Sequence, residues 1–72
     1  MYYYHRMRDI REDRDISQGQ LAEYLQIKQT QLSRYERGVN EIPLHYLVMI
    51  ADYFAVSLDW ITERTDKKEV SQ

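Results

Sequence analysis

The sequence predicts a small all-α domain of five short helices, and three observations lead to this fold class. The chain has 72 residues, which is enough for one hydrophobic core and too few for two. It contains two glycines and one proline, so few positions interrupt regular structure. Apolar residues recur every three or four positions, and no sustained alternation of apolar and polar residues is present, so strands are not expected.

Composition excludes several kinds of chemistry. Apolar residues make up 43% of the chain and charged residues 31%, as in ordinary folded domains. There is no cysteine, so packing alone must hold the fold, and a thiolate zinc site or a cysteine nucleophile is excluded. No apolar run approaches the roughly 18 residues that cross a bilayer, and the start does not resemble a signal peptide. We therefore expect no membrane partner and a cytoplasmic location.

The first three helices are predicted from spacing and from their end signals. Tyr3, Met7 and Ile10 share one helical face, and this helix should end near Asp15. The neighbouring tyrosines at 2–4 could instead form a stacking platform for nucleic acid, but a helix start is the favoured interpretation. Ser17 with Gln20 forms a capping box, so the second helix should begin near Gln18. The third should cover 29–37.

Two further helices follow a loop. Gly38 is suited to end the third helix, and Pro43 to open the fourth. Ser57 can cap a fifth helix. Trp60 is open to two interpretations: it could help to close the core, or it could stay exposed and form a dimer interface with Val56 or Leu58. We expect the polar segment after Thr62 to fray, which gives a domain over 1–64 and a tail over 65–72.

The pattern over about 18–37 is that of a helix-turn-helix. Two short helices are joined by a short turn, and the second carries polar groups that can bond to base edges. An unremarkable solvated helix is the alternative. The net charge is −2, which is unusual for a nucleic-acid-binding domain, but residues 1–40 carry seven basic and six acidic side chains (+1) whereas 41–72 carry three and six (−3). This asymmetry favours a DNA contact in the first half, although a difference so small could arise by chance.

The stretch at 17–38, SQGQLAEYLQIKQTQLSRYERG, closely resembles the phage-repressor-like helix-turn-helix family, which includes Cro and lambda repressor and is also called XRE. Ile10 with Arg11 resembles the first helix of that family, and IPLHYLVMIADYFAVSLDWI at 42–61 resembles its fourth and fifth helices. The resemblance covers about residues 3–62. It implies a compact five-helix lambda-repressor-like DNA-binding domain that regulates transcription, most simply as a homodimer that represses by covering a promoter.

The resemblance also implies roles for individual residues. Four side chains should read bases in the major groove of double-stranded DNA: Gln29, Thr30, Ser33 and Arg34. Gln18 should contact a phosphate, and the loop after the third helix should rest on the DNA backbone, where Arg37 and Asn40 are the residues available for phosphate contacts. Lys28, which departs from the family pattern, is the fourth residue expected at a phosphate. Arg11 and Glu36 should form a partly buried ion pair that ties the first helix to the recognition helix, although two solvated charges are the simpler alternative.

Three positions depart from the family pattern. Gln26 stands where glycine is preferred in the turn, which would cost about 1 kcal/mol if the left-handed conformation is kept. Lys28 replaces the usual Ser or Thr cap of the recognition helix and cannot cap it, but it could reach a phosphate. The loop Val39, Asn40, Glu41 is weakly basic, so we expect modest affinity.

Other function classes have less support. An enzyme is not expected, because the two histidines, His5 and His45, have no catalytic or metal-binding partners at helical spacing. No metal and no cofactor is predicted. The main rival is an antitoxin-type protein that binds and neutralises a toxin, with DNA autoregulation secondary. Such a protein would usually need an added strand or tail, and only about ten polar residues follow Thr62.

Overall fold

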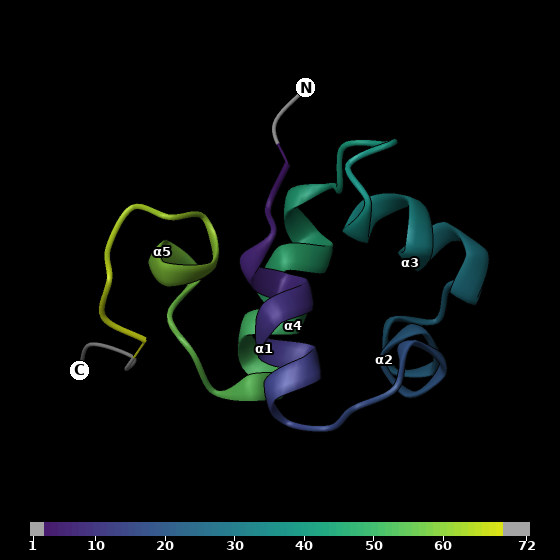
Figure 1. The fold of residues 1–72 in the computed structure, drawn as a ribbon, viewed down its shortest axis with the longest axis horizontal. Helices are drawn as coiled ribbons and strands as arrows, with labels where there is room; N and C mark the ends of the chain where they lie inside the picture. The colour runs from purple at the N-terminus through teal and green to yellow at the C-terminus, as the bar shows by residue number, and fades with distance from the viewer. Residues whose placement is uncertain (1–2, 69–72) are drawn as a thin grey trace.

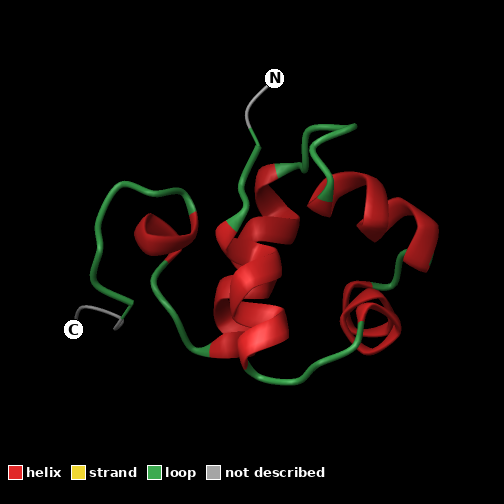
Figure 2. Cartoon of the chain, in the orientation of Figure 1, coloured by secondary structure: helices red, strands yellow, loops and turns green. Residues whose placement is uncertain are grey.

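Every regular element in the computed structural model, which describes residues 3–68, is a helix (Figures 1 and 2). This confirms the all-α fold class. The helices, in chain order, are α1 (Arg6–Asp13), α2 (Gln18–Leu25), α3 (Gln29–Glu36), α4 (Leu44–Phe54) and α5 (Leu58–Ile61).

The helices are arranged around a central pair. In Figure 1, α1 and α4 lie together in the middle, with α2 and α3 on one side and α5 on the other. α4 also contacts α2 and α5, so the longest helix joins both halves of the molecule. This arrangement leaves the outer surface of α3 free of other helices.

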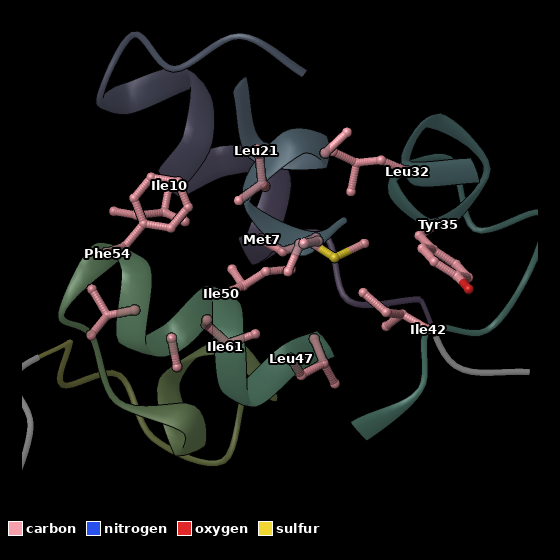
Figure 3. Close-up of a cluster of buried hydrophobic side chains, with 14 of the residues drawn as sticks. Met7, Ile10, Leu21, Leu32, Tyr35, Ile42, Leu47, Ile50, Phe54 and Ile61 are labelled. Carbon is pink, nitrogen blue, oxygen red and sulfur yellow. The ribbon is translucent and has the colours of Figure 1, made fainter. Parts of the chain in front are cut away.

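One hydrophobic core joins all five helices. Met7, Leu21, Leu32, Ile50 and Ile61, one from each helix, are completely buried and lie in the cluster shown in Figure 3. Two buried residues outside the helices, Ile42 and Val56, complete the same cluster. Each such side chain stabilises the fold by about 1.5–3 kcal/mol relative to exposure, and no disulfide contributes.

All five helices end in the same way. The first or second residue after each lies in the left-handed region: Asp15 (φ 56°), Gln26 (φ 60°), Gly38 (φ 75°), Ala55 (φ 55°) and Glu63 (φ 64°). The amide of the following residue then donates to a carbonyl five positions back, as from Val39 to Arg34 at 2.9 Å. This is the Schellman arrangement, which satisfies carbonyls left open at a helix end. Only one of the five positions holds glycine, the residue without a steric penalty there.

The first helix is shorter than the spacing of its apolar residues predicts. It begins at Arg6, and Tyr3 is 41% exposed instead of lying on a buried face. The reason is a contact with Gly38, where an added Cβ would lie only 3.1 Å from Cγ of Tyr3. The amino-terminal segment therefore runs over the end of α3 rather than continuing α1. Tyr2 lies outside the described residues.

The prediction that Trp60 and Val56 are exposed for dimerisation is wrong. Trp60 is 7% exposed and Val56 4%, so both belong to the core. The Trp60 ring is covered by two cations, with the guanidinium carbon of Arg6 5.0 Å and Nζ of Lys68 5.2 Å from the ring centroid. Arg6 and Lys68 lie at opposite ends of the described chain, so no local sequence pattern indicates this cover.

The start of the carboxyl-terminal tail is held in place rather than frayed. The Arg6 guanidinium donates to the carbonyls of Trp60 and Thr65, both at 2.8 Å, and pairs with Asp66 at 3.1 Å. The Ser57 amide also donates to the carbonyl of Lys68 at 2.7 Å. These bonds fasten residues 65–68 to the domain; residues 69–72 lie outside the described part of the chain.

Candidate nucleic-acid interface

The site is built on the α2–α3 pair, which is set by local signals at both helix starts. Ser17 accepts from the Gln20 amide at 3.1 Å, and the Gln20 side chain accepts from the Ser17 amide at 2.9 Å, so the predicted capping box is confirmed. Gln26 keeps the left-handed turn conformation although it is not glycine. Lys28 occupies the cap position of α3 and makes no capping bond through its side chain, as predicted.

The outer face of α3 is polar and accessible. Gln29, Thr30 and Arg34 are exposed, whereas Ser33 is half-buried. On the opposite face, Leu32 and Tyr35 enter the core and fix the rotation of the helix. The side chains predicted to read bases therefore share one face of one short, well-anchored helix.

Cations lie at both ends of this face. Lys28 is exposed at its start and Arg37 at its end. Nε of Arg37 donates to Oγ of Ser33 at 3.2 Å, so these two predicted site residues are joined to each other. Asn40, in the loop after α3, is half-buried, and its amide lies 3.4 Å from the Arg34 carbonyl.

Arg11 and Glu36 form an ion pair beneath the site. Nε and Nη2 of Arg11 donate to the two Glu36 carboxylate oxygens at 2.7 and 3.0 Å, and Nη1 donates to the Ile16 carbonyl at 2.8 Å. Arg11 is 9% exposed and Glu36 1%, so water screens the pair very little. The pair ties α1 and the following loop to the last turn of α3.

Gln18 is bonded on both sides. Its Nε2 donates to Oε1 of Glu36 at 3.0 Å, and its Oε1 accepts from Nε2 of Gln29 at 3.4 Å. Sequence reasoning assigned Gln18 to a phosphate and did not anticipate either bond. It also missed Gly19, where an added Cβ would lie 3.5 Å from Oε1 of Gln29. The sequence signal for this residue is a glycine in the first turn of a helix. Glycine lowers helix stability there, so its presence indicates that a side chain would be in the way.

The histidines lie away from this face. His5 is bonded to Asp9 and Glu63, both at 2.9 Å, and these bonds raise its pKa, with the Asp9 bond contributing most. His45 is exposed with its ring 4.0 Å from that of Tyr46. Among residues 3–68, no group of three or more acidic or imidazole side chains is arranged to hold a metal ion. In the same range, no helix has the length and apolarity that crossing a membrane requires.

Comparison with known proteins agrees with this geometry. A helix-turn-helix family model matches residues 7–61, which is more than half of the chain and includes every helix except the first residue of α1. The chain belongs to the phage-repressor-like helix-turn-helix family. The match includes α2 and α3, the pair over which the sequence predicts the motif.

A curated bacterial protein is similar to this chain. It is the uncharacterized HTH-type transcriptional regulator YobD of Bacillus subtilis (strain 168), which is 34% identical over 64 residues. The match covers 89% of this chain and 57% of the relative, so the chain spans little more than half of that protein's length. No solved structure gives a significant match.

Proposed function

We propose that this helix-turn-helix domain binds double-stranded DNA, reads bases in the major groove with α3 and represses transcription by covering a promoter. The observation that carries the proposal is the exposed face of α3, on which amide, hydroxyl and guanidinium groups lie between a cation at each end. These groups match the donors and acceptors of base edges. The family match and the name of the relative support a regulator of transcription.

The site residues divide into readers and anchors. Gln29, Thr30, Ser33 and Arg34 are proposed to contact bases, with Arg34 donating two bonds to guanine. Four flanking residues are proposed to contact phosphates: Lys28, Arg37, Asn40 and Gln18. Gln18 keeps a second amide hydrogen for this contact, because its bond to Glu36 uses one of the two.

A homodimer is part of the proposal. One recognition helix reads only about four or five base pairs, and the usual solution is a two-fold dimer on half-sites about one helical turn apart. Because Trp60 and Val56 are buried, the interface must lie elsewhere. Leu44 and Val48 are 64% and 39% exposed one turn apart on α4, and each lines a hollow that also includes Leu58. The linings of both hollows include residues of α5 and none of α3, and α5 lies on the side of the molecule away from α3 (Figure 1).

The experiment that tests the proposal separates reading from anchoring. Selection from random duplexes should first yield a preferred site. Arg34→Ala should then weaken binding to that site by about 1–3 kcal/mol and relax the base preference at one position in each half-site. Lys28→Ala should lower the affinity for specific and scrambled duplexes almost equally. It should also reduce the slope of log affinity against log salt concentration by about one unit, because one phosphate contact is lost.

Titration of each variant against both duplexes at several salt concentrations gives the answer. Failure of the wild-type chain to select any sequence would contradict the proposed function. If Arg34→Ala lowered both affinities in parallel and left the selected sequence unchanged, Arg34 would be a phosphate contact, and base reading would rest on the other three side chains.

A further inference from the structure

The amino-terminal segment of the domain lies against the loop that follows α3. An added Cβ on Gly38 would lie 3.1, 3.2 and 3.3 Å from Cγ, Cδ1 and Cβ of Tyr3. The Tyr3 ring therefore rests directly on the backbone of Gly38, and the missing side chain of glycine makes room for this close approach. In Figure 1 the start of the chain and the loop after α3 lie at the same end of the molecule.

Gly38 stands between two residues that are proposed to contact phosphates. Arg37 precedes it and Asn40 follows two positions later, and all three lie after the last residue of α3. The Asn40 amide lies 3.4 Å from the Arg34 carbonyl, which is longer than an ordinary hydrogen bond. The position of Asn40 relative to Arg37 therefore depends strongly on the dihedral angles of Gly38.

Glycine by itself leaves those angles free, and Tyr3 restricts them. Gly38 has φ 75°, and glycine populates positive and negative φ about equally readily. The Tyr3 ring fills the space beside this backbone, so Gly38 cannot change conformation without displacing the ring. The contact thus favours one arrangement of the loop before DNA is bound, and binding then loses less conformational entropy.

Tyr3 is itself held by the residues that follow it. Its ring centroid lies 6.3 Å from that of His5, and His5 is bonded to Asp9 of α1 and to Glu63 after α5, both at 2.9 Å. The next residue, Arg6, donates to one carbonyl of α5 and to one in the segment after it, both at 2.8 Å. The segment is fastened to the domain immediately after Tyr3, so the ring has a fixed base from which to hold the loop.

We propose that Tyr3 is a positioning residue for DNA binding, whose ring holds the loop after α3 in the arrangement in which Arg37 and Asn40 contact phosphates. The proposal rests on the proposed function, since it requires this loop to lie on the DNA backbone. Tyr3 acts through Gly38 and does not itself touch DNA. Phosphate contacts carry no direct sequence information, so Tyr3 affects the affinity for every sequence and leaves the base preference unchanged.

The test is the affinity of Tyr3→Ala for specific and scrambled duplexes at several salt concentrations. Tyr3 is 41% exposed and lies outside the core cluster, and circular dichroism checks that the variant folds. Both affinities should fall by roughly two- to tenfold, which is the contribution of one hydrogen bond. The slope of log affinity against log salt concentration should become shallower by about one unit although Tyr3 carries no charge, because a phosphate contact is lost.

Two further tyrosine variants make the result specific. Tyr3→Phe should keep the wild-type affinity and slope, because ring and Cβ atoms rather than the hydroxyl contact Gly38. If the Tyr3 hydroxyl itself bound a phosphate, Tyr3→Phe would lose as much affinity as Tyr3→Ala, and the inference would be overturned. Tyr24→Ala is the matched control and should keep the wild-type slope, since Tyr24 is 40% exposed but packs on Tyr53.

A combined variant shows whether Tyr3 acts through the loop. In a chain that already carries Arg37→Ala and Asn40→Ala, the contacts that Tyr3 positions are gone. Adding Tyr3→Ala to that chain should therefore change the affinity very little, because residues that act through one another are not additive. A further loss as large as that in the wild-type background would overturn the inference.

The outcomes separate this inference from the function on which it rests. A wild-type chain that selects a sequence, together with a Tyr3→Ala variant that keeps the wild-type affinity and slope, overturns the inference and leaves the DNA-binding function intact. A wild-type chain that binds neither duplex overturns both. A parallel loss of both affinities with a shallower slope in Tyr3→Ala, and neither change in Tyr3→Phe, supports the proposal.

Discussion

Burial of the Arg11–Glu36 pair decides what its removal costs. Both Glu36 oxygens are occupied by Arg11, and neither residue is more than 9% exposed. Removing one partner leaves the other charged and unpaired in a place that water does not reach. That situation costs about 3–5 kcal/mol, whereas an exposed pair contributes at most about 1 kcal/mol.

We therefore expect Arg11→Ala and Glu36→Ala each to lower the free energy of unfolding by several kcal/mol, as measured by urea denaturation. Arg8→Ala is the matched control, because Arg8 and Glu12 form an exposed pair at 3.5 Å. Losses below about 1 kcal/mol in both variants of the buried pair would show that water screens it after all.

At the scale of the helices, the left-handed ends that do not hold glycine contain removable strain. A residue with a Cβ destabilises the folded state by roughly 1–2 kcal/mol in this conformation, whereas glycine does not. Gln26→Gly and Ala55→Gly should each stabilise the protein, by up to about 1 kcal/mol once the greater freedom of glycine in the unfolded chain is counted. Thermal melts with the wild type as reference measure the effect.

Gly38→Ala is the opposite change at an equivalent position. It adds a Cβ at φ 75°, and that atom would lie 3.1 Å from the Tyr3 ring. We expect the free energy of unfolding to fall by about 1–2 kcal/mol. If Gly38→Ala had no effect, or if both glycine substitutions were destabilising, the left-handed geometry would not determine stability at these ends.

The link between the start of α1 and the segment after α5 responds to pH. The bonds to Asp9 and then Glu63 raise the pKa of His5 above its ordinary value of 6.5, so the folded protein binds this proton more tightly than the unfolded chain does. The resulting stability is fully present below pH 6.5 and is lost as the pH rises through the raised pKa of the folded state.

The stability advantage of the wild type over His5→Gln should therefore shrink between about pH 5 and about pH 8, as followed by denaturant titration. His45→Gln is the control, because that ring lies against Tyr46 rather than against two carboxylates. A difference that stays constant or grows with rising pH would mean that the bonds to Asp9 and Glu63 do not hold the proton.

Signals at helix ends explain why the elements could be predicted closely. Ser17 with Gln20, Gly38, and Ser57 each act within a few residues of their own position, and the structure uses all three. The start of α1 was less predictable, because Tyr3 is drawn away by Gly38, a residue far along the chain. The bonds of Gln18 to Glu36 and Gln29 could not be predicted either, since they depend on how α2 and α3 pack.

For the molecule as a whole, the exposed apolar patch on α4 predicts how two copies meet. Val48→Lys should reduce binding to one chain per operator, measured by sedimentation equilibrium, because a charge would be buried in the interface. Tyr53→Lys is a close control on the same helix, since Tyr53 is 37% exposed and Val48 39%, but Tyr53 packs on Tyr24 instead. Two chains of Val48→Lys on one operator would rule out this interface.

The overall assembly was the part least accessible to sequence reasoning. The five helices and one core follow from apolar spacing, but the cover of the Trp60 ring depends on Arg6 and on Lys68 of the returning tail. The contacts of Arg6 join residues more than 50 positions apart, as in its bond to the Trp60 carbonyl. Periodicity within a helix identifies an apolar face and does not show what covers it.

The cation-covered indole has a practical value. Trp60 is the only tryptophan in the chain, and its ring is enclosed by a side chain from α1 and another from the returning tail. Indole fluorescence depends on nearby charge and on access of water, so its emission reports directly on whether the two ends of the domain are closed over α5. The protein thus carries an intrinsic optical probe, on the side of the molecule away from α3 (Figure 1), with which the docking of its tail can be followed in real time without a label.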